Sequence, residues 1–358
     1  MKKVLILANS SGGLYDFRNE LVVELLKTNQ VYVSVPDEVA IDKLREEGCE
    51  IIHTDINRRG MNPVQDMGLF KAYWKLLRKV KPDVVLTYTI KPNIYGGMCC
   101  RLQKVPYIVN ITGLGTTFER GGMLKKMVVA MYKEALKKAD CVFFQNDRNK
   151  QIFEENGIYG KKAKRVNGSG VNVEKYNYEE YPANEKPKFL FVGRLMKEKG
   201  IEEYLSCAKT YASRAEFDII GYCEEAYEEE VNQLQQEGIL RFHGFQKEVK
   251  SFYKGTDAVV IASYHEGMSN VLLEAAATGR PVLATNIPGC KEAVEDNMTG
   301  LLFAPRDTGA LETTIEFFLS MSTKKREAMG RAARVKMEQE FNRKDVVESY
   351  IEEINNVI

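Results

Sequence analysis

Short apolar runs and longer amphipathic segments alternate along the first half of the chain. The apolar runs are rich in β-branched and aromatic residues, which favours strands, and the segments between them repeat apolar residues every three or four positions, which favours helices. The predicted strands are "KVLILAN", "VYVSV", "DVVLTY", "YIVNIT" and "CVFFQN", and the predicted helices include "RNELVVELLKT" and "GLFKAYWKLLRKV". This alternation is typical of a parallel sheet with crossover helices.

The alternation stops after the first half and then begins again. Residues 168–188 read "GSGVNVEKYNYEEYPANEKPK", a polar stretch with two prolines and no sustained periodicity, which predicts a linker. A second series of predicted strands follows, at "FLFVG", "FDII", "RFHGF", "DAVVIAS", "PVLATN" and "GLLF". The chain is therefore predicted to be an α/β protein with two Rossmann-like domains. Because ligands of open α/β folds bind at the carboxyl ends of the strands, we expect the two domains to face each other across a binding cleft.

The predicted organisation has four parts. They are a first domain at residues 1–170, a linker at 171–187, a second domain at 188–340, and a C-terminal helix at 341–358 that reads "FNRKDVVESYIEEINNVI".

The composition excludes several classes of protein. The chain has 358 residues, 44% hydrophobic and 28% charged, which is enough for two full cores. Its longest apolar runs are far shorter than the roughly 20 residues of a membrane-spanning helix, and its N-terminus enters a strand pattern instead of a signal peptide. The seven scattered cysteines contain no CxxC pair, which indicates buried thiols in a reducing compartment. We therefore expect a cytoplasmic protein.

Charge is unevenly divided, although the net charge is only +1. Residues 1–170 hold 28 Lys and Arg against 18 Asp and Glu, a net charge of +10, whereas residues 171–358 hold 23 against 32, a net charge of −9. One interpretation is that the first half faces an anionic partner, such as phosphates or an acidic membrane surface. The other is an unspecific drift in the charge of a solvated surface.

Cationic residues follow the first strand of the second half. After "FLFVG" come Arg194, Lys197 and Lys199, and then Gly200 and a predicted helix. Two cations on a glycine-containing loop at the end of a strand are well placed to bind a diphosphate. Lys197 is equally explained as a solvated surface residue, whereas Arg194 directly follows an apolar strand and Gly193.

The stretch "HEGMSNVLLEAAATGRPV" places two glutamates around the start of a helix. Ser269 is a good N-cap, Gly279 a C-cap, and Pro281 prevents continuation of the helix. The helix N-terminus at residues 268–271 would offer backbone N–H groups and a positive dipole to a phosphate. Glu266 precedes this helix and Glu274 lies inside it. A nucleotide sugar contains two sugars, and the two carboxylates could accept hydrogen bonds from their hydroxyl groups. Taken alone, Glu274 could also be an ordinary exposed helix residue.

These motifs resemble a known family. "HEGMSNVLLEAAATGRPVLATNIPGCKEAV" resembles the double-glutamate signature of retaining GT-B glycosyltransferases of family four, and "FLFVGRLMKEKGI" resembles the diphosphate-binding loop of that family. The resemblance covers nearly the whole chain. The stretches "RRGMNPVQD", "TYTIKPNIYGG" and "NITGLGTTF" are similar to bacterial enzymes that build capsule, exopolysaccharide or lipid-linked oligosaccharides.

The resemblance implies a role for each motif residue. Arg194 and Lys199 would neutralise the donor diphosphate, Glu274 would accept from the ribose hydroxyls, and Glu266 would contact the transferred sugar. Phe245, in the loop "HGFQ", would lie where the base is bound through main-chain groups. The implied catalytic residues are Arg194, Lys199 and Glu266, and the implied donor-binding residues are Gly193, Phe245, Met268, Ser269, Asn270, Val271 and Glu274.

Two positions depart from the pattern of that family. Many members have a histidine after the fourth strand of the first domain, where this chain reads "NITGLG" and has Asn110, Thr112 or Gly113. Members often have Gly-x-Gly after the second strand of the second domain, where this chain has Gly221-Tyr222-Cys223.

The implied reaction needs no cofactor. No Asp-x-Asp metal motif is evident, and two side-chain cations could replace Mg²⁺ in stabilising the departing diphosphate. We therefore expect metal-independent transfer with retention at the anomeric carbon, by front-face attack of the acceptor hydroxyl. The donor implied by the resemblance is a UDP-linked hexose or N-acetylhexosamine, with GDP-mannose as the alternative.

The acceptor is expected on the basic first domain. Residues 121–138, "GGMLKKMVVAMYKEALKK", combine an apolar surface with five lysines and could rest on an anionic membrane that carries a polyprenyl-diphosphate-linked sugar. An ordinary core-facing helix explains the same pattern. By resemblance, the C-terminal helix would cross back to the first domain. The acceptor-side candidates lie at or beyond strand ends: Gly12, Gly13, Arg18, Lys91, Asn93, Thr112 and Gly113.

Three alternatives remain on sequence grounds. A nucleotide-sugar 2-epimerase would also have two Rossmann-like halves and bind a UDP-sugar, but it would need no acceptor. A non-catalytic nucleotide-sugar-binding partner subunit would bind without turnover. A nucleic-acid-binding protein is disfavoured because the basic residues are spread over many helices without an aromatic-basic motif.

Overall fold

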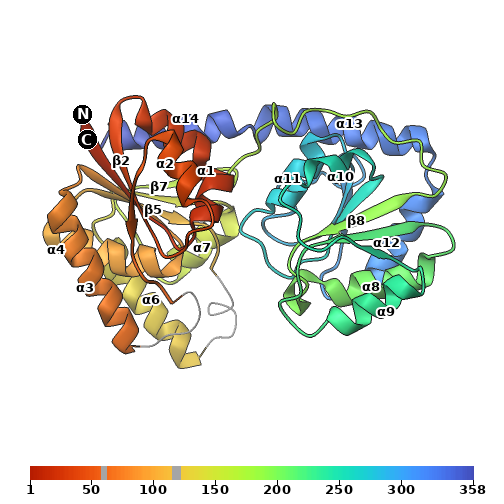
Figure 1. Cartoon of the computed structure of the whole chain (residues 1–358), viewed down its shortest axis with the longest axis horizontal. Helices are drawn as coiled ribbons and strands as arrows, with labels where there is room; N and C mark the ends of the chain where they lie inside the picture. Colours follow the sequence, from red (N-terminus) through yellow and green to blue (C-terminus); the bar gives the residue numbers. More distant parts are fainter. Residues whose placement is uncertain (58–62, 115–121) are drawn as a thin grey trace. The chain divides into compact units, whose positions relative to one another are not determined.

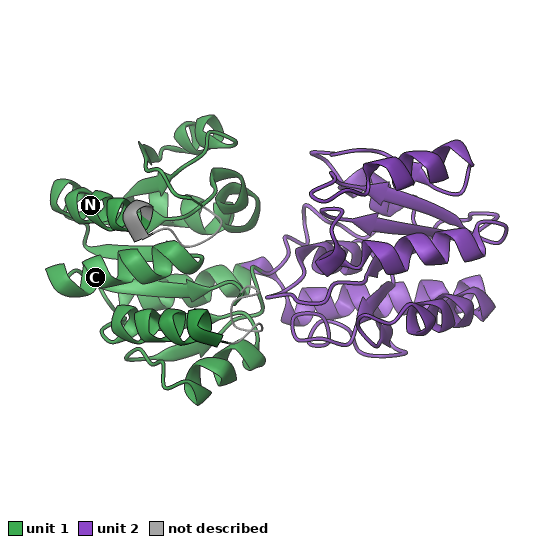
Figure 2. Cartoon of the chain, turned by 90° about the horizontal axis from the view of Figure 1, so that it is seen from below, with its two compact units in different colours: residues 1–169, 344–358 green, residues 170–343 purple. Residues whose placement is uncertain are grey.

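The computed structural model describes residues 1–57, 63–114 and 122–358. Residues 58–62 and 115–121 lie outside this description; they include parts of the stretches "RRGMNPVQD" and "NITGLGTTF" and the first residue of the predicted helix at 121–138. The chain divides into two compact units, shown in different colours in Figure 2. Unit 1 consists of Met1–Ser169 together with Lys344–Ile358, and unit 2 of Gly170–Arg343.

Unit 1 is built on a parallel sheet of seven strands in the order β3-β2-β1-β4-β5-β6-β7. Its elements are β1 (Lys2–Leu7), α1 (Ser11–Leu26), β2 (Asn29–Val35), α2 (Ile41–Glu47), β3 (Glu50–His53), α3 (Pro63–Val80), β4 (Val84–Tyr88), the π-helix η1 (Pro92–Gly96), α4 (Gly97–Gln103), β5 (Tyr107–Ile111), α6 (Gly122–Leu136), β6 (Cys141–Phe144), α7 (Asp147–Glu155), β7 (Ala163–Arg165) and the C-terminal helix α14 (Arg343–Asn355). The five strands predicted in this half are confirmed, whereas β3 and β7 were not predicted.

Helices cover both faces of this sheet, because alternate side chains of each strand point to opposite faces. Leu5 and Leu7 of β1 pack in a core with α3, α4 and α6, whereas Val4 and Ile6 pack in a second core with α1, α2 and α14. Figure 1 shows the same division of the helices between the two faces. Both faces are therefore buried, which explains the continuous apolar runs in the sequence.

The C-terminal helix α14 completes the second of these cores. Its buried residues Val346, Tyr350 and Ile354 belong to the same cluster as the side chains of α1. The Tyr350 ring lies 4.1 Å from the Phe143 ring, measured between centroids, and Glu353 accepts a hydrogen bond from Lys164 at 3.3 Å. The last helix is thus an integral part of unit 1.

Unit 2 has a parallel sheet of six strands in the order β10-β9-β8-β11-β12-β13. Its elements are β8 (Lys188–Val192), the 3₁₀ helix η2 (Lys197–Lys199), α8 (Ile201–Tyr211), β9 (Glu216–Ile220), α9 (Glu228–Gln236), β10 (Arg241–Phe242), α10 (Lys250–Lys254), β11 (Ala258–Ile261), α11 (Asn270–Ala277), β12 (Val282–Thr285), β13 (Gly300–Phe303), α12 (Thr308–Ser320) and α13 (Thr323–Glu340). One face is covered by α8, α9 and α12, and the other by α10, α11 and part of α13. All six predicted strands are present.

Each sheet reverses its strand order once. In unit 1 the reversal lies between β1 and β4, and in unit 2 between β8 and β11. Loops that leave the carboxyl ends of these two strands diverge to opposite faces, which opens a crevice where ligands of α/β sheets bind. The reversal point of each unit is therefore the place to look for functional side chains.

Two further expectations can be compared with the structure. All seven cysteines lie in the described part of the chain as free thiols, and six of them are buried. Over the described ranges, none of the helices combines the length and apolarity that crossing a membrane requires.

Candidate functional site

The reversal point of unit 2 brings two predicted motifs together. Arg194 follows the end of β8, whereas Glu266 lies in the loop after β11. The two loops are joined directly, because the Tyr264 N–H donates to the Glu198 carbonyl at 2.9 Å. This hydrogen bond holds η2, with Lys199, beside the loop that carries Glu266.

Lys199 and Glu266 form an ion pair across this junction. The Lys199 Nζ lies 2.6 Å from Glu266 Oε1, and both side chains are largely buried. The pair joins residues 67 positions apart, as the motif interpretation requires. A partly buried ammonium group beside a carboxylate can bind a phosphate oxygen while the carboxylate accepts from a sugar hydroxyl.

Arg194 also has an acidic partner. Its Nη1 lies 2.5 Å from Glu224 Oε2, in the loop after β9. Nothing in the sequence singled out Glu224, since its position relative to Arg194 depends on the adjacent packing of β8 and β9. Lys197 pairs with Glu202 at 3.1 Å on the exposed surface, in line with the solvated alternative for that residue.

The start of α11 agrees with the expected cap and corrects one detail. The Ser269 hydroxyl accepts from the Leu272 N–H at 3.4 Å, so Ser269 is the N-cap. The Ser269 N–H itself donates to the Gly289 carbonyl at 3.1 Å and is not available to a phosphate. Met268 is buried in the core, so only its main chain can face a ligand. Among the first-turn amides of α11, the Val271 N–H is a candidate donor for an anion.

The end of α11 also differs slightly from the sequence expectation. The C-cap is Thr278 instead of Gly279, which follows it in the left-handed conformation with φ +84°. This is the usual arrangement of a terminating glycine one residue beyond the cap.

Glu274 faces inward from α11 and is not an ordinary exposed helix residue. Its Oε2 accepts from the Tyr253 hydroxyl at 3.0 Å. Burial raises the pKa of Glu274 above its ordinary value of 4.5, and hydrogen bonds from Tyr253 and Tyr176 oppose part of that shift. No sequence motif points to these tyrosines, which come from α10 and from the segment before β8.

Phe245 lies in the loop after β10, where the resemblance places the base. Its side chain is 66% exposed, which is unusual for a phenylalanine. Gly193 directly follows β8 and donates its N–H to the Ile220 carbonyl at 2.9 Å. The donor-binding residues predicted from the sequence thus lie on loops at the carboxyl edge of the unit 2 sheet or in the first turns of α11.

In unit 1, the glycine pair predicted after the first strand lies in the first turn of α1. Ser10 is the N-cap of that helix and accepts from the Gly13 N–H at 3.2 Å. A side chain at Gly12 would lie 3.1 Å from Val39. The start of α1 is thus closely packed at the β1 side of the unit 1 reversal point: Ser11 and Gly12 are buried, and the Ser11 N–H donates to Asp37 Oδ1 at 2.9 Å.

Lys91 and Asn93 lie on the β4 side of that point, and both have partners. Lys91 Nζ forms an ion pair with Asp66 at 2.7 Å. The buried Asn93 accepts from the Thr87 hydroxyl at 2.8 Å and donates to the Asn110 carbonyl at 2.8 Å. Asn93 and Asn110 thus connect β4 and β5 from within, and their side chains position the surrounding loops.

Of the remaining candidates, Arg18 and Thr112 are linked through the side chain of Gln145, whereas Gly113 is not part of this contact. Arg18 is buried, with its guanidinium 5.7 Å from the Tyr88 ring and 5.5 Å from the Tyr350 ring. With its amide oriented to satisfy both neighbours, Gln145 accepts from Arg18 at 3.0 Å and donates to the Thr112 carbonyl at 3.1 Å. At Gly113 a side chain would meet open space.

A strained segment marks the same place. Thr89, directly after β4, has φ +71°, and the π-helix η1 follows at Pro92–Gly96. Such features persist where the surrounding structure holds them and occur frequently at functional sites. Sequence periodicity cannot reveal either of them.

No group of three or more His, Cys, Asp or Glu side chains in residues 1–57, 63–114 and 122–358 is arranged to hold a metal ion.

Comparison with known families decides the class of protein. The family "Glycosyl transferases group 1" matches residues 174–336, and the family "Glycosyl transferase 4-like" matches residues 3–146. The chain is a glycosyltransferase. The two matched regions fall on the two units, so the unit 2 site is the part of this glycosyltransferase that the group 1 family describes.

Curated relatives of this glycosyltransferase come from several bacteria. It is 23% identical over 335 residues to N,N'-diacetylbacillosaminyl-diphospho-undecaprenol alpha-1,3-N-acetylgalactosaminyltransferase of Campylobacter jejuni, covering 88% of this chain and 89% of the relative. It is 26% identical to UDP-Gal:alpha-D-GlcNAc-diphosphoundecaprenol alpha-1,3-galactosyltransferase of Escherichia coli, covering 70% and 69% of the two chains. The capsular polysaccharide biosynthesis glycosyltransferase CapM of Staphylococcus aureus is 25% identical, with 84% and 83% covered.

Solved structures share the fold of the glycosyltransferase. HepE of Anabaena in complex with UDP-glucose superposes with a TM-score of 0.83 at 17% identity, covering 99% of this chain and 100% of HepE. Sucrose-phosphate synthase of Thermosynechococcus elongatus gives a TM-score of 0.80 at 18% identity, covering 100% and 99%. The predicted GT-B architecture is confirmed.

The family assignment also separates the alternatives left open by the sequence. The protein is a retaining glycosyltransferase and therefore an enzyme. The 2-epimerase and the non-catalytic partner subunit are not the class of protein that the family describes.

Proposed function

We propose that the enzyme transfers a hexose or N-acetylhexosamine from a UDP-linked donor to a glycan acceptor attached to a polyprenyl diphosphate, in the biosynthesis of a surface polysaccharide. The proposal is supported by two relatives whose names specify diphospho-undecaprenol acceptors, one of which also specifies UDP-Gal as the donor. Together they cover most of this chain at low identity, so the sugar itself is left to experiment.

The observation that carries the donor half of the proposal is the cluster at the unit 2 reversal point. Arg194 and Lys199 each hold a carboxylate within 2.6 Å, and Glu266 lies in the loop that leads into α11. In the reaction, the bond between the anomeric carbon and the diphosphate breaks, and negative charge develops on the departing phosphate. Cations and helix dipoles fixed at that place stabilise this charge more than the charge of the bound donor.

The carboxylates would then serve the two sugars of the donor. Glu266, freed from Lys199 by the diphosphate, accepts from hydroxyls of the transferred sugar. Glu274, held by Tyr253, accepts from the ribose. A donor with both sugars and a diphosphate engages both cations together with Glu266 and Glu274, which a free nucleotide or a sugar phosphate would not.

Stereochemistry follows from the linkages of the relatives. Both diphospho-undecaprenol enzymes form alpha-1,3 linkages. Common UDP-hexose donors are also α-linked, so an α-linked product requires retention at the anomeric carbon. Front-face attack satisfies this requirement without a protein nucleophile, with the acceptor hydroxyl proton passing to the departing phosphate oxygen.

The acceptor half of the proposal rests on unit 1. Helix α6 turns Val128, Tyr132 and Leu136 into the core, but its first turns expose Met123 and Met127 next to lysine side chains. Exposed apolar residues flanked by lysines are typical of a helix that rests on an anionic lipid surface. We infer that the enzyme works in the cytoplasm, at the inner face of the cell membrane, with the start of α6 in peripheral contact with lipid.

The test of the donor and the reaction begins with the purified enzyme, a panel of UDP-, GDP- and ADP-sugars, and undecaprenyl-diphosphate-linked GlcNAc. We expect transfer from one UDP-sugar, with an α-anomeric proton in an NMR time course. The matched variants are Lys199→Met, which should lose most activity, and Lys197→Met, which should keep it. Transfer with inversion contradicts the proposal. So does transfer from a GDP- or ADP-sugar but from none of the UDP-sugars.

Liposome flotation tests the membrane contact. The wild type should float with vesicles that contain anionic lipid and remain in solution with neutral vesicles. Met123→Asp/Met127→Asp should abolish flotation while transfer to a water-soluble short-chain acceptor is retained. If the wild type and the variant float equally, or if flotation is the same with anionic and neutral vesicles, α6 is not the membrane contact that we propose.

A further inference from the structure

A buried arginine of α1 connects several elements of unit 1 near its reversal point. Arg18 is 5% exposed, and its guanidinium lies 5.7 Å from the Tyr88 ring of β4 and 5.5 Å from the Tyr350 ring of α14. Its Nη2 lies 3.0 Å from the amide oxygen of Gln145, which directly follows β6. Arg18 thus joins α1 to two strand ends and to the C-terminal helix.

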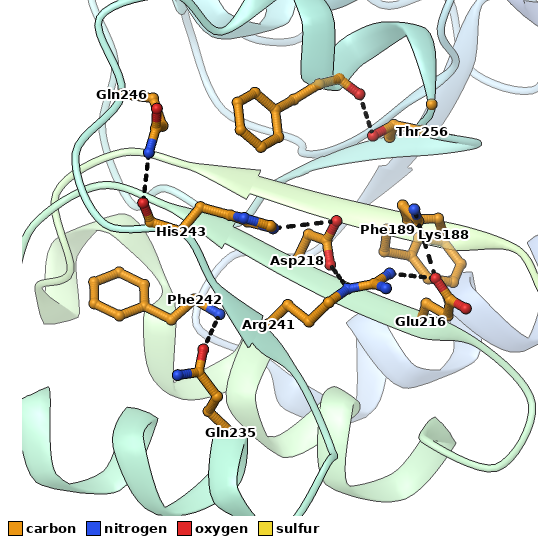
Figure 3. Close-up of polar contacts among 12 residues, drawn as sticks. Lys188, Phe189, Glu216, Asp218, Gln235, Arg241, Phe242, His243, Gln246 and Thr256 are labelled. Carbon is orange, nitrogen blue, oxygen red and sulfur yellow. Dashed lines mark hydrogen bonds and ion pairs between the residues drawn. The ribbon is translucent and has the colours of Figure 1, made fainter.

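The charge of Arg18 lacks an acidic partner. In the described part of the chain, Arg18 forms no ion pair with a carboxylate, and its buried Nε has no hydrogen-bond partner. Arg241 of unit 2 provides the contrast: its side chain is half exposed, and Figure 3 shows its guanidinium against the carboxylates of Asp218 and Glu216, with 2.8 Å between Nε and Asp218 Oδ1. Burying a guanidinium without a carboxylate costs free energy, and contacts with two aromatic rings offset only part of that cost. Stability alone therefore does not explain Arg18.

Gln145 extends the contact of Arg18 to the loop after β5. The main-chain ladder between β5 and β6 ends with the pair Ile111–Phe144, and the next residues of the two strands are Thr112 and Gln145. In the orientation that satisfies both neighbours, the Gln145 amide accepts from Arg18 and donates to the Thr112 carbonyl at 3.1 Å. A side-chain link thus continues the pairing of the two strands beyond the last main-chain pair, and it ends on Arg18.

Thr112 lies in a segment whose position matters for the acceptor. It follows β5 directly, in the stretch where this chain departs from the family pattern, and it is one of the acceptor-side candidates. The next residue, Gly113, borders open space, because a side chain built there would meet no atom within 4 Å. Loops of this kind move more than the strands they leave unless side chains fix them. The Gln145 amide is such a contact, and it holds the main chain at Thr112 against the core of unit 1.

We propose that Arg18 and Gln145 are positioning residues for the acceptor: they hold the main chain at Thr112 in the geometry that sugar transfer requires, and the Tyr350 ring of α14 holds Arg18. This inference rests on the proposed lipid-linked acceptor and on its place at unit 1. In this role Arg18 acts through Gln145 and needs no contact of its own with the acceptor. A displacement of about 1 Å at such a loop costs about 100-fold in rate, since reacting groups must meet in a narrow range of geometries.

The variant Gln145→Glu tests this role while keeping the contact with Arg18. The new carboxylate gains an ion pair with the guanidinium but has no N–H for the Thr112 carbonyl. With undecaprenyl-diphosphate-linked GlcNAc and the UDP-sugar that the wild type uses, kcat/KM for the acceptor should fall by about 10- to 100-fold. The affinity for UDP, measured by calorimetry, should be unchanged, because the substitution lies in unit 1. The urea midpoint should be no lower than that of the wild type, because Arg18 then has the carboxylate that it lacks.

The matched control is Gln103→Glu. Gln103 is the last residue of α4, and its amide also donates to a main-chain carbonyl, that of Trp74, at 3.1 Å. The same substitution there removes the same kind of hydrogen bond within unit 1, and kcat/KM for the acceptor should be unchanged. Equal losses of kcat/KM in the two variants would overturn the proposal, because any added carboxylate in unit 1 would then have the same effect.

A double-mutant cycle tests whether the two residues act together. Arg18→Met removes the donor to Gln145, and Gln145→Leu removes the link to Thr112. If both act through one chain of contacts, the double variant should lose no more kcat/KM for the acceptor than the larger of the two single losses. Losses that multiply would show that Arg18 does not act through Gln145, which contradicts the proposal.

The outcomes separate this inference from the proposed function. If the wild type transfers sugar and Gln145→Glu transfers it equally well, the positioning role is wrong and the proposed function stands. A weaker affinity for UDP in Gln145→Glu also overturns the positioning role, since the effect would then not be confined to the acceptor. A lower urea midpoint would contradict the contact with Arg18. If the wild type transfers sugar to no lipid-linked acceptor, the proposed function itself fails.

Discussion

Replacing Gly200 with alanine should disturb the site through the backbone alone. Gly200 follows Lys199 and begins α8, with φ +71°. A Cβ atom there would lie 2.2 Å from the Ala262 carbonyl oxygen and 2.5 Å from the Ala262 side chain. Because Ala262 directly follows β11 and begins the loop that holds Glu266, any shift that relieves this contact moves Lys199 relative to that loop.

Gly238 provides a matched control, because its φ is +73° and a side chain there would meet nothing within 4 Å. The left-handed conformation costs an alanine about 1–2 kcal/mol at both positions. The crowding at Gly200 adds about 1–3 kcal/mol, the usual cost of overpacking. We therefore expect Gly238→Ala to lower the free energy of unfolding by about 1–2 kcal/mol and Gly200→Ala by about 2–5 kcal/mol. The gain from a less flexible unfolded chain is common to both variants and cancels in the difference.

Urea unfolding followed by far-UV circular dichroism measures this difference, and a donor-binding assay measures its effect on the site. For a unit of this size, the corresponding shifts in Tm are about 2–8 °C for Gly238→Ala and about 4–20 °C for Gly200→Ala. Only Gly200→Ala should also lose affinity for the donor at a temperature where it is folded. Equal destabilisation of the two variants would refute the close approach of α8 to β11.

Three further predictions concern the charged groups. Burial raises the pKa of Glu274 above 4.5, so as the pH rises the Glu274 carboxyl loses its proton later in the folded state than in the unfolded state. The free energy of unfolding therefore falls as the pH rises from 4.5 toward the pKa of the folded state. In Glu274→Gln the free energy of unfolding should fall less with rising pH, and at pH 7–8 without ligand this variant should be more stable than the wild type. It should also bind UDP more weakly. Parallel pH profiles of stability for the two proteins would contradict this. Arg194→Ala and Lys199→Met should each lower kcat/KM by about 10- to 150-fold, the worth of a charge-assisted hydrogen bond, and a change below threefold would exclude the residue from diphosphate binding. Activity should persist in EDTA, and its loss with recovery on adding Mg²⁺ would show that the cations do not suffice.

The sequence predicted the central strands better than the edge strands, for a physical reason. β1, β4, β5 and β6 are buried on both faces and therefore read as apolar runs. β3 has the sequence "EIIH" and β7 "AKR", and both lie at the edges of the unit 1 sheet with half-buried or exposed side chains. Such short edge strands form because a neighbouring strand is already in place, and their own composition carries no strand signal.

Site residues that belong to a sequence motif could be predicted, whereas site residues that are brought in by the packing of separate elements could not. Two separate motifs put Lys199 and Glu266 at one donor site, and the structure brings the two side chains within 2.6 Å of each other. Glu224 and Tyr253 each reach the site because separate strands or helices end side by side, which no local pattern records. Asn93 was chosen for its position at a strand end, but its amide is committed to neighbouring strands.

The placement of α14 fixes the order in which the two units can be completed during synthesis. Unit 2 is one continuous stretch, Gly170–Arg343, and all of it leaves the ribosome before α14 does. Unit 1 lacks Tyr350 and its neighbours until the last residues appear, so its core between α1 and the sheet stays open for roughly ten seconds or more at usual rates of translation. The first domain to be made is thus the last to be finished. A released chain that ends before Lys344 should expose this core to chaperones although unit 2 is complete and can fold.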